Sequence, residues 1–286
     1  MNKTRPVQRF GLWIMVFGLS ALTTTARAVD TTQNTEAHTE KQQEQQQIAD
    51  CQKITRYAQA GQKAYHAGNY SKARTYFEDQ ATWSHACRVL FQGEQTGFSI
   101  SDSAVATADN NVALTYIKQK NYLKARAWLM INPDDKKSQY NIDLIKNKLA
   151  KLDTSNQSKS PVGEYWQYAG NGAWNVVGVK QKGTQYQISF SGLYMGMMSM
   201  YYGPNMGEFT TLSPIKNGRA IWKESETEGL AAGEGCTVTM AFKPERVTLT
   251  TTQGECGFGH NVRADGDFLR ISFLRVSYDY RLDDLH

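Results

Sequence analysis

The spacing of apolar residues changes once along this chain, and the change divides it into two kinds of structure. Between 49 and 151 apolar and small residues recur at helical intervals, and the clearest set on one face is Ile54, Tyr57, Ala58, Gly61 and Tyr65. From 162 onward apolar and polar residues alternate, as in Tyr186–Phe190, which is typical of strands. The polar stretch 152–161 predicts a linker between them. We therefore predict an α+β chain of two separate domains, helical over 49–151 and antiparallel β over 162–282.

The first 28 residues have the pattern of an export signal. Basic residues precede an apolar run, Phe10–Leu22, and a small-residue site follows at Ala26-Arg27-Ala28. This pattern predicts a signal peptide of the Sec type, cleaved after Ala28. Four of the 32 Lys and Arg lie in this segment, so the mature chain keeps 28 against 27 Asp and Glu.

The nearly neutral mature chain argues against nucleic acid as a partner. Residues beyond the leader contain no apolar stretch long enough to cross a bilayer, so we expect no transmembrane segment after cleavage. The expected location is periplasmic or secreted. Residues 29–48 are rich in Gln, Glu, Thr and Lys and predict a flexible, Gln-rich tether.

Four cysteines in an exported chain are candidates for disulfide bonds. Four cysteines allow three pairings, and the sequence alone does not choose among them. Cys51 and Cys87 flank one predicted helical hairpin, while Cys236 and Cys256 flank one predicted β-hairpin, so we pair them within each half. No closely spaced cysteine pair of the kind found in zinc sites is present in the sequence.

One helical unit recurs. The stretch Gly68–Arg74, Gly-Asn-Tyr-Ser-Lys-Ala-Arg, aligns with 120–126, Lys-Asn-Tyr-Leu-Lys-Ala-Arg. Each copy has two small residues twelve positions apart and a large apolar residue one turn later: Gly61, Ala73 and Phe77, then Ala113, Ala125 and Leu129. At these positions the chain resembles the tetratricopeptide repeat family. It departs from that family in spacing, because the copies lie 52 residues apart and the family period is about 34.

The resemblance implies antiparallel helix pairs, with the helix 138–149 capping the apolar face. It also implies a concave groove for a protein or peptide segment, and hence an adaptor role. The groove candidates are the inward positions of the first helix of each pair: Tyr57, Gln62, Tyr65, Asn110, Asn111 and Tyr116.

The β part is divided by turn signals into seven to nine short strands. These signals are Lys182-Gly183, Asn217-Gly218, Lys243-Pro244-Glu245 and Asp265-Gly266. Many short alternating strands predict a closed antiparallel barrel or a small sandwich. The stretch 256–266 resembles a closing signature of small secreted bacterial β-domains of lipocalin-like architecture. That resemblance implies a fold and export, and no reaction comes with it.

A methionine-rich segment is the densest unusual feature of the β part. If it is a regular strand, both of its faces are apolar, which suits core packing or a contact surface. As a contact surface it comprises Tyr194, Met195, Met197, Met198, Met200, Tyr201 and Tyr202. Thioethers also suit Cu(I) and Ag(I), with His260 as a further ligand, so a periplasmic protein binding these metals is an alternative.

Acidic residues form the last candidate surface. Glu224, Glu226 and Glu228 alternate, with Glu234 beyond a glycine turn. A solvated face is the favoured interpretation. Recognition of a basic cell-wall hydrolase, as an inhibitor or immunity protein, is the alternative.

The sequence offers no strong catalytic candidate. His260 with Asp265 and Asp267 is the one His/Asp cluster of the predicted β-domain, and the sequence contains no Gly-x-Ser-x-Gly element. We therefore predict no catalytic residues, no cofactor and no dedicated metal site. The expectation is an exported, non-enzymatic interaction protein of the bacterial cell envelope that binds a protein or peptide.

Overall fold

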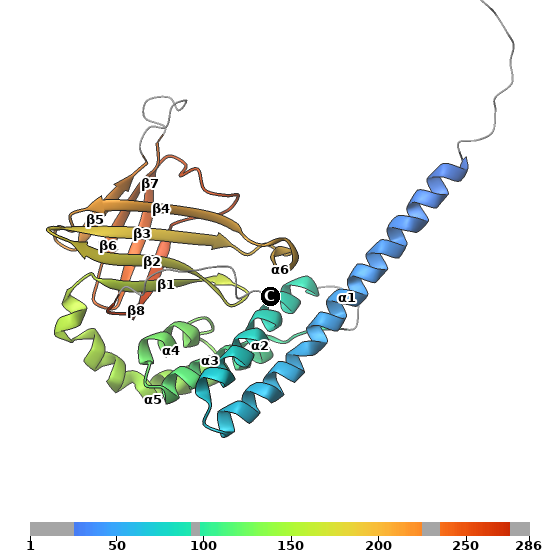
Figure 1. Cartoon of the computed structure of the whole chain (residues 1–286), viewed down its shortest axis with the longest axis horizontal. Coiled ribbons are helices and arrows are strands. Elements are labelled where there is room, and N and C mark those ends of the chain that lie inside the picture. The colour runs from blue at the N-terminus through green and yellow to red at the C-terminus, as the bar shows by residue number, and fades with distance from the viewer. Residues whose placement is uncertain (1–25, 93–97, 225–234, 275–286) are drawn as a thin grey trace, which may run out of the picture. The chain divides into compact units, whose positions relative to one another are not determined.

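The helical part opens with one long helix. The structure is a computed structural model and describes residues 26–92, 98–224 and 235–274. Helix α1 runs through Ala26–His66 (Figure 1). The stretch 29–48, for which composition predicts a flexible tether, is helical here, because Gln, Glu and Lys are also good helix formers. Residues 1–25 of the predicted signal peptide lie outside the described residues.

In the helical part, α2 to α5 follow α1, and the repeated unit begins two of them in the same way. Their bounds are α2 Tyr70–Leu90, α3 Asp102–Lys118, α4 Tyr122–Leu129 and α5 Lys136–Asp153. Asn69 and Asn121 cap α2 and α4, and each side chain accepts a hydrogen bond from the backbone N three residues on. Their backbone angles nearly coincide (φ −86° and −90°, ψ 74° and 71°). The offset of 52 in the sequence therefore marks a repeated turn and cap.

Small residues allow the helices to approach closely. Ala73, Ala113 and Ala125 are fully buried in the helical core. A Cβ on Gly61 of α1 would lie 2.4 Å from the ring of Phe77 of α2, so that the absence of a side chain is what permits this packing.

The β part is an eight-stranded antiparallel sheet that curls into a nearly closed barrel (Figure 1). The strands are β1 Gly163–Gly170, β2 Ala173–Lys182, β3 Gln185–Tyr194, β4 Asn205–Ser213, β5 Arg219–Lys223, β6 Thr237–Phe242, β7 Arg246–Gln253 and β8 Gly266–Ser272. Their order is β4-β3-β2-β1-β8-β7-β6-β5. Of the two predicted β architectures, the barrel is the one observed.

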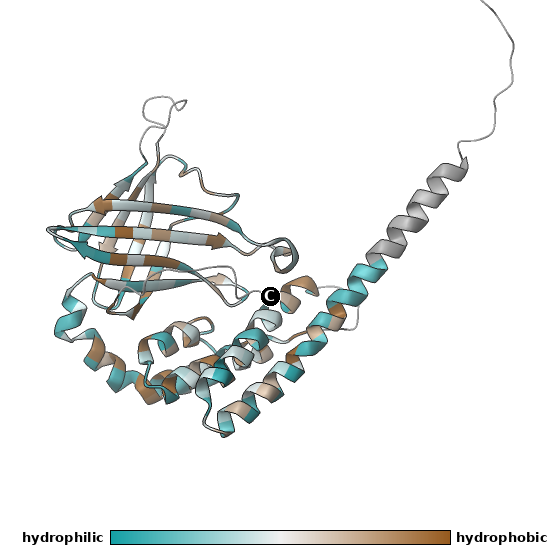
Figure 2. Ribbon diagram, viewed as in Figure 1, coloured by the Kyte–Doolittle hydropathy of each residue, from teal (hydrophilic) through white to brown (hydrophobic). Residues whose placement is uncertain are grey.

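The barrel interior is filled by apolar side chains. Hydrophobic and hydrophilic residues alternate along the strands (Figure 2). The inward set includes Tyr165, Val177, Ile188, Phe190 and Phe268, each at most 2% exposed. The centre of this barrel is therefore packed as a hydrophobic core.

One seam of the barrel lacks backbone pairing. The strand order ends at β4 and β5, which are not hydrogen-bonded to each other. Aromatic packing bridges them instead, because Trp222 of β5 stacks on Phe209 of β4 with centroids 4.2 Å apart and planes 6° apart. Phe258, from the loop before β8, lies parallel to Trp222 at 6.3 Å.

Helices α2–α5 and the barrel pack together. Residues Gln47–His286 form one compact unit. Ala127 of α4 shares a buried cluster with Trp166 of β1 and Ile271 of β8. The expected linker is structured, since α5 ends at Asp153 and a 3₁₀ turn, η1 Asn156–Lys159, leads to β1. The predicted order of a helical part and a β part is thus confirmed, with a packed interface between them.

Two buried arginines organise this interface. Arg126 of α4 pairs with Asp153 at 2.8 Å. It also donates to the carbonyls of Glu245 at 3.3 Å and Arg270 at 3.2 Å, which belong to the β part. Arg270 of β8, itself fully buried, donates to the carbonyls of Val162 and Ser160 just ahead of β1.

Both predicted cysteine pairings are confirmed. Cys51 of α1 is bonded to Cys87 of α2, and Cys236 is bonded to Cys256. The first bond fixes the helical hairpin, and the second joins the start of β6 to the loop before β8. Within the described ranges, no helix combines the length and the apolar character needed to cross a membrane.

Candidate functional sites

A hollow of about 450 Å³ lies between α3 and α5. Thr107, Asn110, Asn111 and Leu114 of α3 and Lys136, Lys137, Tyr140 and Asn141 of α5 line it. Tyr140 is 65% exposed and Leu144, one turn further along α5, is 59% exposed. Neither Lys136 nor Lys137 forms an ion pair with a described residue, although Lys137 Nζ donates to Thr107 Oγ1 at 2.7 Å.

Amide side chains form the floor of this α3–α5 hollow and are held by each other. Asn110 donates to the Ala106 carbonyl at 2.8 Å and to Ser138 Oγ at 2.9 Å. Asn110 Oδ1 accepts from Asn141 at 2.7 Å. The floor is therefore rigid and polar, while the rim carries an exposed aromatic ring and two positive charges.

The groove residues predicted from the repeat are only partly brought together. Asn110 and Asn111 line the α3–α5 hollow, although Asn110 is buried and uses its amide within the fold. Tyr116 is also buried, and the Arg74 guanidinium lies 4.6 Å from its ring centroid. Tyr57, Gln62 and Tyr65 lie on α1, apart from this hollow.

Tyr140, Lys136 and Lys137 are not among the residues predicted from the sequence, because the sequence pattern predicts the last helix only as a cap. A signal was present, since Tyr140 and Leu144 lie four residues apart on a face other than that of the buried Ile145 and Leu149. A terminal helix with apolar residues on two faces indicates a second contact surface.

The methionine-rich segment is not a strand. Residues 195–198 form a turn and Ser199–Tyr202 form the single helical turn α6, between β3 and β4. Met197 is 60% exposed and Tyr202 is 81% exposed. Tyr201 Oη donates to Asp50 Oδ2 of α1 at 3.3 Å, and burial together with this carboxylate raises the pKa of Tyr201 to about 12. The expected strand with two apolar faces is thus corrected to a partly exposed connection that contacts α1.

A second hollow, of about 460 Å³, lies at the seam between β4 and β5. We call it the seam pocket. Its walls include Glu208 of β4, Trp222 of β5, Glu224 directly after β5, and Phe258. One carboxylate oxygen of Glu224, Oε2, is buried and has no hydrogen-bond partner among the described residues.

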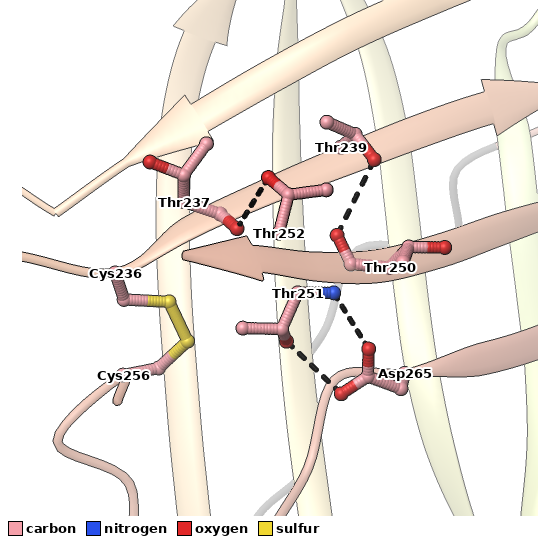
Figure 3. The surroundings of a disulfide bond; sticks show 8 residues. All are labelled: Cys236, Thr237, Thr239, Thr250, Thr251, Thr252, Cys256 and Asp265. Atoms are coloured by element: carbon pink, nitrogen blue, oxygen red, sulfur yellow. Dashed lines mark hydrogen bonds between the residues drawn. A yellow bond between two sulfur atoms is a disulfide. The ribbon is translucent and has the colours of Figure 1, made fainter. Parts of the chain in front are cut away.

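The loop that carries Phe258 into the seam pocket is fixed at both ends (Figure 3). Cys256 is bonded to Cys236 of the β6 side. Asp265 accepts from the backbone N of Thr251 at 2.6 Å and from its hydroxyl at 2.9 Å. A Cβ at position 207 would lie 2.6 Å from the Phe258 side chain, so Gly207 allows that side chain to lie against β4.

The His260 cluster is only partly assembled. His260 and Asp265 line a polar hollow of about 500 Å³ formed by the loop 254–265, but Asp265 is engaged by Thr251. Asp267 instead accepts from Arg246 at 3.0 Å. Of the four candidate glutamates, Glu226, Glu228 and Glu234 lie outside the described residues.

A buried His/Asp contact joins α2 to α3. His85 Nε2 lies 3.0 and 2.9 Å from the two carboxylate oxygens of Asp109. Asn132 also donates to Asp109 at 2.7 Å, and the Tyr168 ring of β1 packs 5.2 Å from the His85 ring. Burial raises the pKa of Asp109, and the bonds from His85 and Asn132 oppose that rise. Because His85 and Asp109 are held by Asn132 and Tyr168 of the protein itself, we assign this contact a structural role.

A second charged cluster lies where α2 and α4 approach β1. Burial raises the pKa of Glu78 to about 7, although Arg74, Lys124 and Tyr116 favour its charged form. Lys124 Nζ lies 4.9 Å from the ring centroid of Trp166 in β1, and burial lowers its pKa. These side chains come from α2, α3, α4 and β1 and interact with one another.

In the parts of the chain that the structure describes, no group of three or more His, Cys, Asp or Glu side chains is arranged to hold a metal ion. Comparison with known protein families, curated proteins and solved structures finds no match. The function must therefore be argued from the sites themselves.

Proposed function

We propose that this chain is an exported, non-enzymatic binding protein of the bacterial cell envelope that holds a protein or peptide segment in the α3–α5 hollow. Two disulfides and the absence of a membrane-spanning helix among the described residues are compatible with a protein outside the cytoplasm.

The observation that carries this proposal is the rim of the hollow. Tyr140 stands 65% exposed on a regular helix, next to Lys136 and Lys137, over a floor whose amides are held in place. Tyrosine is enriched among residues that dominate binding energy, because its ring is large and rigid and its hydroxyl is polar. A preorganised floor lowers the ordering cost of binding.

The test places a photoreactive phenylalanine analogue at Tyr140 and, as a control, at Leu212 on the barrel surface, which is similarly exposed. Crosslinking in cells identifies a partner, and the purified partner is then titrated against the Tyr140→Ala variant. We expect a loss of affinity of about tenfold or more. Tyr202→Ala, which removes an exposed tyrosine elsewhere, is expected to bind like the parent chain.

Other outcomes favour the alternative functions. A partner that is a basic cell-wall hydrolase, inhibited one-to-one and unaffected by Tyr140→Ala, would favour the inhibitor hypothesis. Tight Cu(I) binding that is lost when Met197, Met198 and Met200 become Leu would favour metal handling. An unchanged affinity of Tyr140→Ala for its crosslinked partner would refute the proposed site.

A further inference from the structure

In the seam pocket, one buried carboxylate oxygen receives no hydrogen bond from any described residue. Glu224 is held by its backbone, whose N donates to the Cys236 carbonyl at 2.9 Å, while its Oε2 atom is buried without a donor. A buried carboxylate oxygen without a partner is costly, and such groups in folded proteins call for an explanation, such as an ion or a ligand.

A second carboxylate, Glu208, lines the same pocket from β4. Neither Glu208 nor Glu224 forms an ion pair with a described residue, and the described part of the lining includes no lysine, arginine or histidine. Two unpaired carboxylates at one hollow favour a positively charged occupant.

The remaining walls distinguish an organic cation from a metal ion. Trp222 and Phe258 present parallel aromatic rings beside the carboxylates, with Met206 at the edge. An aromatic ring attracts a cation over its face and also packs against an aliphatic chain. Calcium takes six to eight oxygen ligands, and the described lining offers two carboxylates and few other side-chain oxygens.

We propose that the seam pocket binds the side chain of a lysine or arginine from a protein partner. The charged head group pairs with Glu224 and Glu208, and the aliphatic stem lies against Trp222 and Met206. The pocket is on the barrel rather than on the helices, so it is a second contact point and does not depend on the α3–α5 hollow. Trp222, which stacks on Phe209 at the seam, also forms a wall of the pocket, so binding and seam closure share this side chain.

The test uses small probes and the full mature chain, so no partner needs to be known. The indole ¹H–¹⁵N signal of Trp222 is followed while Nα-acetyl-lysine amide or Nα-acetyl-arginine amide is added. Nα-acetyl-norleucine amide serves as the neutral probe and calcium chloride as the metal probe. We expect millimolar dissociation constants for the two cations, weakening with salt, and binding at least about tenfold weaker for norleucine.

Glu224→Gln keeps the shape of the side chain and removes its charge, and it is expected to weaken binding of both cations about tenfold. Glu255→Gln, an exposed change of the same kind in the neighbouring loop, is the control and is expected to bind like the parent. Unfolding midpoints of both variants establish that the fold is retained.

Three results would overturn the proposal: equal binding of the norleucine and lysine probes, a calcium response lost in Glu224→Gln, or no response to either cation up to about 50 mM. A larger loss in Glu255→Gln than in Glu224→Gln would overturn it as well. None of these outcomes depends on whether Tyr140 binds a partner, so the two proposals fail separately.

Discussion

Replacing Gly61 by alanine tests the close approach of α1 and α2. The new Cβ would lie 2.4 and 2.5 Å from two ring carbons of Phe77, whereas carbon atoms in contact stay roughly 3.5 Å apart or more. The ring or the helix must therefore shift by about 1 Å, and such overpacking costs about 1–3 kcal/mol. Alanine also gains about 1 kcal/mol of helix propensity over glycine. We expect a net loss of up to about 2 kcal/mol in the free energy of unfolding.

A double-mutant cycle separates these two effects. Urea unfolding of the parent, Gly61→Ala, Phe77→Leu and the double variant is followed by tryptophan fluorescence and circular dichroism. Leucine at 77 leaves space beside α1, so Gly61→Ala in that background is expected to be neutral or to stabilise by up to about 1 kcal/mol. If Gly61→Ala alone stabilises the protein as at an exposed helix position, the packing argument is wrong.

Two further predictions concern charged groups. Arg126→Gln removes the bond to Asp153 and two bonds to the barrel backbone, and is expected to destabilise the fold by about 2–4 kcal/mol in urea unfolding. The control is Lys146→Gln, which breaks an ion pair whose side chains are 64% and 70% exposed. It should cost less than about 0.5 kcal/mol. Equal effects of the two substitutions would contradict the role assigned to Arg126. Burial raises the pKa of Glu78 from 4.5 to about 7, so its contribution to stability is complete below pH 4.5 and is lost as the pH rises through 7. The Glu78 side chain is 41% exposed, and solvent therefore screens the effect. The free energy of unfolding of Glu78→Gln should rise relative to that of the parent by on the order of 1 kcal/mol between pH 5 and 8. A difference in urea midpoints that does not change with pH would contradict this.

Features set by local sequence were predictable. The two periodicities locate the helices and strands, and Asn217-Gly218 forms a turn with positive φ at both residues, as its composition indicates. The recurring asparagine caps are local as well. The disulfide pairing followed from position along the chain, because each bond lies within one half.

Features that depend on contacts between distant segments were not predictable. The seam pocket combines Glu208, Trp222 and Phe258 from three segments, and only barrel closure brings them together. The methionine-rich segment has no polar period to fix a strand register, and in the structure it forms the connection between β3 and β4. Residues 29–48 show the limit of composition, because a polar segment rich in Gln, Glu and Lys can still form part of a long helix.

The position of Arg126 has a consequence for the order in which the protein folds. Every strand pairing in the barrel joins strands consecutive in the chain except β1 with β8, where Glu164 pairs with Ser272. Two four-stranded meanders can therefore form from local contacts, whereas joining them requires the closure of a long loop, which is slow. Arg126 contacts the backbone at Glu245 and Arg270, and Arg270 contacts the backbone leading into β1. If the helical part folds first, Arg126 can hold the backbone of β8 close to that of β1. A β part expressed without α4 should therefore close into a barrel more slowly than the whole chain does.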